Sequence, residues 1–110
     1  MEIHHKMKRD APSGTAKNVV NVMLSGGSSS ENRVVFGRSG FRKDGEVGVA
    51  SLRGGDVPGD HTVYFLGASD RIEISHKVND RAVFARGSLE FMERLIVKKP
   101  GLYTVFDLLG

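Results

Sequence analysis

The spacing of the apolar residues changes twice along this chain, and this change constrains its fold most. Residues 14–27 carry apolar side chains at helical spacing, residues 33–78 alternate in the manner of strands, and residues 81–97 return to helical spacing. Met1 to His5 reads as a short strand or an extended lead-in. The order strand, helix, four strands, helix is typical of the α+β class. We expect a mixed, mostly antiparallel sheet of about four to five strands, with two helices on one face.

The expected strands cover residues 33–38, 45–55, 61–67 and 70–78, and a flexible loop is expected over 25–32. Ser13 is a good N-cap for the first helix, and Gly26 and Gly27 are expected to end it. Gly87 inside the second helix suggests a close backbone contact. The apolar tail 102–110 is expected to dock on the core. The strands offer apolar residues on both faces, so we expect the open face to pair with another copy of the chain.

Composition excludes several classes of protein. The 110 residues suit one domain, and the absence of cysteine excludes disulfides and thiol catalysis. No apolar run approaches the roughly 20 residues of a membrane-spanning helix. The net charge of +3 and the few aromatic residues give little support to nucleic-acid binding. We therefore expect a cytoplasmic protein that binds neither membranes nor nucleic acid.

The stretch HHKMKRDAPSGT, residues 4–15, joins a cluster of cationic side chains to a helix start. In an extended chain, His4, Lys6 and Lys8 lie on one face, while His5 and Arg9 lie on the other. A bend after His5 brings both histidines and a lysine to one concavity. The helix that follows begins with free N–H groups and a positive dipole end. Together these features predict a site for a carboxylate or a phosphate.

Each part of this stretch also has a simpler interpretation. Ser13, Gly14 and Thr15 can be no more than a helix cap, and the lysines can form a solvated surface. The four histidines show no metal-ligand spacing, so we expect no metal site. Asp60 and His61 suit a turn and a sheet rather than catalysis. His76 alternates with isoleucines and suggests a buried or interface position.

The sequence EIHHKMKRDAPSGTA resembles the signature of the 4-hydroxy-tetrahydrodipicolinate reductases, also called dihydrodipicolinate reductases. This family acts in bacterial lysine and diaminopimelate biosynthesis. The resemblance continues in LRGGDVPGDHTVYF, in DRIEISHKVNDRAVFARGSL and in the ending KKPGLYTVFDLLG. It covers the chain apart from residues 17–43.

The resemblance implies a mechanism and a set of site residues. The family reduces a cyclic, unsaturated dicarboxylate with NADPH or NADH. It implies that His4 is the general acid and that Lys8 holds the substrate and stabilises developing charge. It also implies that a substrate carboxylate binds to His5, Ser13, Gly14 and Thr15. Arg81 and Phe84 are our choices for contacts with the cofactor, with core packing as the alternative for Phe84.

The resemblance covers only part of the family enzyme, which is about twice as long. Its N-terminal half is a dinucleotide-binding domain with a glycine-rich loop, and no G-x-G-x-x-G occurs here. We therefore expect residues 1–110 to be a single substrate-binding and oligomerisation domain that forms homotetramers through its sheet. We expect the chain alone to be inactive. The alternative is a stand-alone anion-binding or assembly module without catalysis.

Overall fold

The computed structural model describes residues 1–26 and 33–109, which form two compact units. The first unit, Met1–Val78, contains β1 (Glu2–His4), α1 (Gly14–Ser25), β2 (Arg33–Phe36), β3 (Glu46–Val49), β4 (Ser51–Arg53), β5 (Asp60–Leu66) and β6 (Arg71–Lys77). The second unit, Asn79–Gly110, contains α2 (Ala82–Leu95) and α3 (Val105–Leu109). The expected α+β class is confirmed. The loop expected over 25–32 lies almost wholly outside the described residues.

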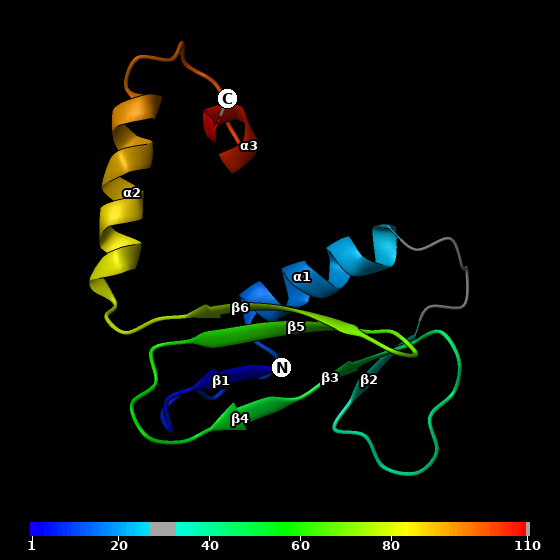
Figure 1. The fold of residues 1–110 in the computed structure, drawn as a ribbon. Coiled ribbons are helices and arrows are strands. Elements are labelled where there is room, and N and C mark those ends of the chain that lie inside the picture. Colours follow the sequence, from blue (N-terminus) through cyan, green and yellow to red (C-terminus); the bar gives the residue numbers. More distant parts are fainter. Residues whose placement is uncertain (27–32, 110) are drawn as a thin grey trace. The chain divides into compact units, whose positions relative to one another are not determined.

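Four strands form a mixed sheet in the order β4-β1-β5-β6, and α1 lies along one side of it (Figure 1). β1 pairs in parallel with β4 and antiparallel with β5. β5 and β6 form an antiparallel hairpin, in which Val63 lies opposite Ile74 and Phe65 opposite Ile72. The short β1 is therefore a central strand, and its side chains lie between those of two neighbours.

The strand expected over residues 45–55 is wrong in one respect, because it is two strands in two sheets. β3 pairs in parallel with β2 in a separate two-stranded sheet, whereas β4 pairs with β1. The break falls at Ala50, whose carbonyl accepts a hydrogen bond from the N–H of Glu2 at 2.9 Å. The apolar residues change phase at this point, from Val47 and Val49 before the break to Leu52 after it. A change of phase can also mark a bulge within one strand, and pairing partners are decided by segments far away in the sequence, so the pattern alone did not show the second sheet.

The first helix begins as its sequence predicts. Ser13 is the N-cap, and its Oγ accepts a hydrogen bond from the N–H of Ala16 at 3.2 Å. The Ala11-Pro12 bond before it is cis. Gly26 caps the other end through its N–H. The side chain of Ser13 thereby fixes where the helix starts, and its backbone N–H remains available for a further contact.

The second unit consists of two helices in contact. α2 covers Ala82–Leu95, close to the expected 81–97. The apolar tail contains a short helix, α3, and Arg94 Nη1 donates a hydrogen bond to the Leu108 carbonyl at 2.9 Å. The close contact expected at Gly87 is wrong within the described part of this unit, since a Cβ there would meet no atom within 4 Å.

Among the described residues, polar side chains outnumber apolar ones at the buried positions. Val49 and Val78 are the buried apolar residues, whereas Glu2, His4, Ser13 and Thr62 are the buried polar ones. Buried polar groups require partners, so these four mark the part of the fold to examine for function. His76, expected at a buried or interface position, is exposed on β6. The described helices include none with the length and apolar character needed to cross a membrane.

Candidate functional site

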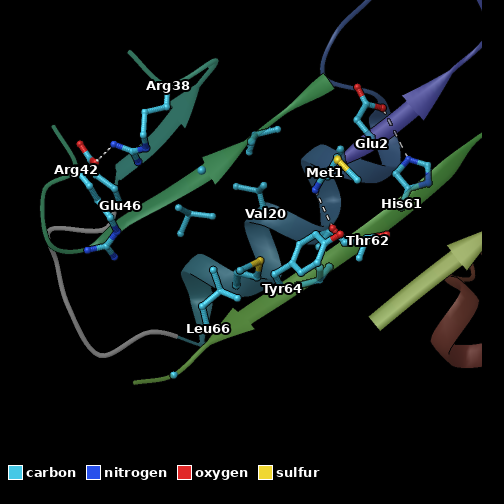
Figure 2. Close-up of a pocket in the computed structure, with 18 of the residues that line it drawn as sticks. Met1, Glu2, Val20, Arg38, Arg42, Glu46, His61, Thr62, Tyr64 and Leu66 are labelled. Atoms are coloured by element: carbon cyan, nitrogen blue, oxygen red, sulfur yellow. Dashed lines mark hydrogen bonds and ion pairs between the residues drawn. The ribbon is translucent and has the colours of Figure 1, made fainter. Parts of the chain in front are cut away.

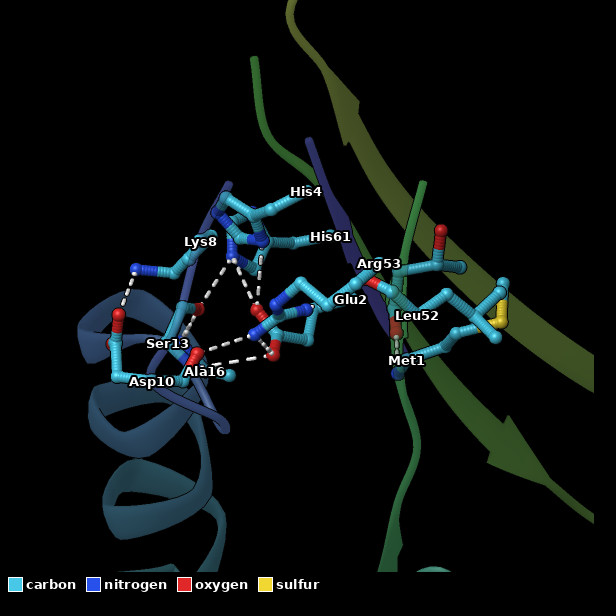
Figure 3. A network of polar contacts seen from close by, with 11 residues as sticks. Met1, Glu2, His4, Lys8, Asp10, Ser13, Ala16, Leu52, Arg53 and His61 are labelled. Carbon is cyan, nitrogen blue, oxygen red and sulfur yellow. Dashed lines mark hydrogen bonds and ion pairs between the residues drawn. The ribbon is translucent and has the colours of Figure 1, made fainter. Parts of the chain in front are cut away.

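Glu2 is the centre of a buried polar network (Figure 3). Its side chain is only 1 % exposed. Oε1 accepts hydrogen bonds from Arg53 Nη2 at 2.8 Å and from the N–H of Ser13 at 3.2 Å. The carboxylate therefore links β1, β4 and the start of α1. Burial of this charge is tolerated because a guanidinium and a helix N–H both donate to it.

Two histidines lie against the same carboxylate (Figure 3). His4 Nδ1 is 2.9 Å from Glu2 Oε2, and His61 Nε2 is 3.9 Å from it. The two imidazole rings meet edge to face, with 5.1 Å between centroids. His61 Nε2 also lies 3.0 Å from Ser13 Oγ. His61, which the sequence suggested was structural, thus belongs to the network around His4.

The protonation of these groups follows from their surroundings. Burial opposes ionisation of Glu2, but hydrogen bonds from Arg53 and Ser13 outweigh it and lower the pKa of Glu2 from 4.5 to about 2. Burial lowers the pKa of His4 below its usual 6.5, and the Glu2 charge only partly offsets this. Burial, together with the nearby His4, also lowers the pKa of His61. Near neutral pH the cluster therefore holds one carboxylate and two neutral imidazoles.

The residues expected to bind an anion lie beside this cluster. Ser13 is buried, while Gly14 and Thr15 are exposed at the N-terminal end of α1. Lys8 Nζ forms an ion pair with Asp10 Oδ1 at 2.7 Å. The structure therefore brings His4 and Ser13 into one network and places Lys8 nearby with Asp10 as its partner. Lys8 therefore already has one anionic partner, which uses one of its three N–H donors.

Arg53 and Gly59 are further members of the site that the sequence analysis did not name. Arg53 Nη2 bridges Glu2 and the Asp10 carbonyl, the latter at 2.7 Å, so it holds the loop after β1 against β4. Gly59 leaves room for His4, since a Cβ there would lie 3.0 Å from His4 Nε2. A lone arginine on a predicted strand and one glycine among 14 carried no signal that set them apart.

A cavity of about 720 Å³ lies between α1, β3 and β5 (Figure 2). Glu2 and His61 reach one part of its wall, and Arg38 and Glu46, paired at 2.7 Å, line another. Much of the wall is apolar and comes from α1, with Ala16, Val19, Val20 and Met23. His4, Lys8 and Thr15 are not in the lining, so the cavity and the predicted anion site are different places.

The residues chosen for cofactor contact lie in the second unit. Arg81 is the N-cap of α2 and makes no side-chain cap hydrogen bond. Phe84 is 52 % exposed, so its alternative as a core residue is wrong within the described residues. Both side chains are available to a ligand or a partner.

Comparison with known proteins identifies the family. The family model for the C-terminus of dihydrodipicolinate reductase matches residues 1–109. This chain belongs to that family. It is 50% identical to the 4-hydroxy-tetrahydrodipicolinate reductase of Aquifex aeolicus (strain VF5) over an alignment of 112 positions, which covers 100% of this chain and 42% of the relative. The Rhodopseudomonas palustris (strain TIE-1) reductase is 49% identical, with the same coverage of each protein. The chain thus spans less than half the length of these reductases.

A solved structure supports the fold. It is a dipicolinate-bound dihydrodipicolinate reductase from Paenisporosarcina sp. TG-14, which matches with a TM-score of 0.67 and 24% identity. The match covers 94% of this chain and 41% of that one. The architecture described above is therefore that of the C-terminal part of a dihydrodipicolinate reductase.

Proposed function

We propose that this chain is the substrate-binding and oligomerisation part of an NAD(P)H-dependent 4-hydroxy-tetrahydrodipicolinate reductase. The observation that carries this proposal is the family match over residues 1–109. The start of α1, which adjoins cationic side chains, adds a suitable place for an anionic substrate. The pathway is lysine and diaminopimelate biosynthesis, in the cytoplasm. Residues 1–110 act as one functional domain in this proposal, although they form two compact units.

The dicarboxylate binds at the start of α1. One carboxylate accepts hydrogen bonds from the free N–H groups of Gly14 and Thr15 and from the hydroxyls of Ser13 and Thr15. His5 contributes a further donor. Lys8 exchanges Asp10 for the substrate, because a bound dianion offers a stronger partner than one exposed carboxylate. Support comes from the Paenisporosarcina reductase, which binds dipicolinate, a planar cyclic dicarboxylate.

His4 supplies the proton. In the free site its pKa is lowered, so the ring is neutral. The two negative charges of the bound substrate favour the imidazolium and raise the pKa of His4. Substrate binding therefore increases the fraction of His4 that is protonated and able to act as the acid. Glu2, at 2.9 Å from Nδ1, stabilises that imidazolium and leaves Nε2 to face the substrate. Glu2 is thus a positioning residue for His4.

The hydride must come from outside the residues described so far. When bound, a nicotinamide cofactor, NADPH or NADH, supplies it. Arg81 and Phe84 fit a contact with its phosphate and ring, since both are exposed within one turn at the start of α2. The chain contains no G-x-G-x-x-G, so the main cofactor site belongs to the N-terminal domain of a complete reductase. We expect no turnover by this chain alone, and activity without an added nucleotide domain would contradict this division.

The experiment is a calorimetric titration of the chain with pyridine-2,6-dicarboxylate, in buffer with EDTA. We expect saturable binding, weakened roughly 10-fold or more by Lys8→Ala and by Thr15→Ala, because each removes a donor to a charged carboxylate. Lys6→Ala is the matched control, since Lys6 is exposed in the same loop, and its effect should stay under about 2-fold. Equal weakening by Lys6→Ala would reduce the site to general attraction by positive charge.

The apolar pairs on the β5–β6 hairpin carry the proposed oligomerisation. Val63 lies opposite Ile74, and Phe65 opposite Ile72, so the four side chains share one face. Phe65, Ile72 and Ile74 are all about half exposed or more. β6 is also an edge strand with free backbone groups. We propose that further copies of the chain cover this face in a homotetramer.

A further inference from the structure

The hydroxyl of Ser13 has a single proton to donate, and the groups around it decide where that proton points. Ser13 is only 3 % exposed, so water has little access to its side chain. Its Oγ accepts a hydrogen bond from the N–H of Ala16 at 3.2 Å, which uses one lone pair. Oγ also lies 3.0 Å from Nε2 of His61. The direction of the hydroxyl therefore depends on whether this nitrogen donates or accepts.

The imidazole of His61 can meet the hydroxyl in two ways. A neutral imidazole has a proton on one ring nitrogen and a lone pair on the other. If Nε2 has the lone pair, Ser13 donates its only proton to His61 and keeps none for a ligand. If Nε2 has the proton, it donates to the second lone pair of Oγ, and the hydroxyl proton stays available. Donation from the Ser13 hydroxyl to a substrate carboxylate therefore requires the second arrangement.

The charge of Glu2 favours a proton on Nε2 of His61. Oε2 of Glu2 lies 3.9 Å from this nitrogen, and the Glu2 side chain is 1 % exposed. A carboxylate at this distance attracts an N–H and repels a lone pair, and it does so more strongly in an enclosed site than in water. Among the described residues, Oε2 also lacks a hydrogen-bond partner, so an N–H on its side reduces the cost of burying it.

We propose that His61 is a positioning residue for the Ser13 hydroxyl in the dicarboxylate site. Its Nε2–H donates to Oγ, and the hydroxyl proton is thereby left for a carboxylate of the substrate. His61 acts through Ser13 and makes no contact with the substrate. The inference rests on the proposed function, since it names the residue that makes one of the proposed donors available.

The sheet brings the parts of this arrangement together. His61 on β5 lies opposite Glu2 on β1, and the His61 side chain is 16 % exposed. The other carboxylate oxygen of Glu2, Oε1, accepts a hydrogen bond from the N–H of Ser13 at 3.2 Å. One buried carboxylate therefore fixes the backbone at the start of α1 through Oε1 and the proton of His61 through Oε2. Both effects prepare Ser13 before a ligand arrives.

Loss of the Nε2 donor should weaken the contact that Ser13 makes with the substrate. A hydroxyl that accepts from an N–H is the stronger donor, because hydrogen bonds in a chain polarise one another. With leucine at position 61, the second lone pair of Oγ has no donor and the proton is free to turn away from the substrate. His61→Leu should lower the affinity for pyridine-2,6-dicarboxylate roughly 3-fold to 10-fold, the range expected for one hydrogen bond.

The first experiment is an imidazole ¹⁵N spectrum of the unsubstituted chain without ligand, at slightly alkaline pH. The ring of His61 is neutral there, because burial and the nearby His4 lower its pKa. We expect Nε2 of His61 to be protonated and Nδ1 to be unprotonated. A lone pair on Nε2 would overturn the proposal. The result needs no substrate, so it tests His61 separately from the proposed function.

The second experiment is a calorimetric double-mutant cycle with pyridine-2,6-dicarboxylate. We expect Ser13→Ala with His61→Leu to bind no more weakly than Ser13→Ala alone, because His61 acts only through the hydroxyl. His61→Gln should keep the affinity within about 2-fold, since its amide can also donate to Oγ. His76→Leu is the matched control, because it removes an exposed imidazole from the neighbouring strand, and it should have no effect.

The same titrations contain the results that would contradict the role of His61. Additive losses from Ser13→Ala and His61→Leu in folded chains would mean that His61 acts by another route. A His61→Gln variant as weak as His61→Leu would mean that the shape of the ring matters and not its donor. If the unsubstituted chain fails to bind the dicarboxylate, the proposed function is wrong, and the spectrum still decides whether His61 donates to Ser13.

Discussion

The polar cluster around Glu2 and the apolar surface of the β5–β6 hairpin follow opposite rules. Around Glu2, charged and polar side chains are largely enclosed. They form hydrogen bonds and ion pairs with one another across β1, β4, β5 and the start of α1. On the hairpin, by contrast, Ile72 and Ile74 are 61 % and 60 % exposed. The first region is completed by its own chain. The second region has apolar surface that no described residue of its own unit covers.

This difference matches the two tasks that we propose for the chain, dicarboxylate binding and self-association. A site for a dianion needs donors held in place before the ligand arrives, and buried hydrogen bonds provide that rigidity. An assembly surface needs apolar area that stays available until a copy binds. The cluster should therefore respond to changes in charge and pH, and the hairpin to changes in apolar area.

The largest effect is expected from Glu2→Gln. The substitution keeps the shape but removes the charge that Arg53 and the start of α1 share, and it leaves Arg53, whose side chain is 19 % exposed, without its charged partner. Loss of one partner from a buried pair costs about 3–5 kcal/mol. Urea denaturation should show this loss in the free energy of unfolding.

Glu73→Gln provides the matched control. Glu73 lies on the exposed β6 strand, where Oε1 pairs with Arg71 Nε at 2.7 Å. Both partners are solvated, so the loss should not exceed about 1 kcal/mol. If the two substitutions cost the same, the contrast between the buried cluster and the hairpin would be wrong.

The pH dependence of stability should show the same cluster. A carboxyl with a lowered pKa adds stability that is complete above its unfolded value and is lost as pH falls. For Glu2 the window runs from 4.5 down to about 2. The total loss across it is about 3 kcal/mol. Denaturation curves at several pH values should show this loss, and Glu2→Gln should remove it while leaving the contributions of Asp10 and Glu46.

His4 and His61 affect stability in a higher pH range than Glu2, and there too stability falls as the pH falls. The pKa values of His4 and His61 are lowered from 6.5, so the unfolded chain binds more protons and stability falls as pH drops below 6.5. A chain whose stability rose on acidification through this window would contradict the buried, neutral imidazoles.

Part of the fold and part of the site could be predicted from the sequence. The class, both long helices and the Ser13 cap follow from local signals, namely apolar period and turn chemistry. His4, Lys8 and the start of α1 were predicted as one region, and the structure places His4 and Ser13 in one network. Arg53 and His61 were missed as members because strand pairing brings them there, and pairing partners leave no mark in a single sequence.

Assembly should respond to the hairpin. We expect Ile72→Asp with Ile74→Asp to weaken self-association roughly 100-fold, about 2.7 kcal/mol, because the substitutions place charges in an apolar contact. Light scattering over a range of concentrations measures this. The unfolding of a single copy should change little, since both side chains are exposed. An unsubstituted chain that stays monomeric at micromolar concentration would remove the assembly role.

The smallest effect is expected in α2, at Gly87. A glycine within a helix costs up to about 1 kcal/mol relative to alanine, and a Cβ here would meet no atom within 4 Å. Gly87→Ala should therefore stabilise the chain by about 0.5–1 kcal/mol, as measured by denaturation. Ala85→Gly, at an exposed position of the same helix, should cost a similar amount. If Gly87→Ala instead destabilises the chain or weakens its assembly, a partner must approach the α2 backbone at this glycine. α2 would then share the role that we propose for the hairpin, as a surface that contacts another copy of the chain.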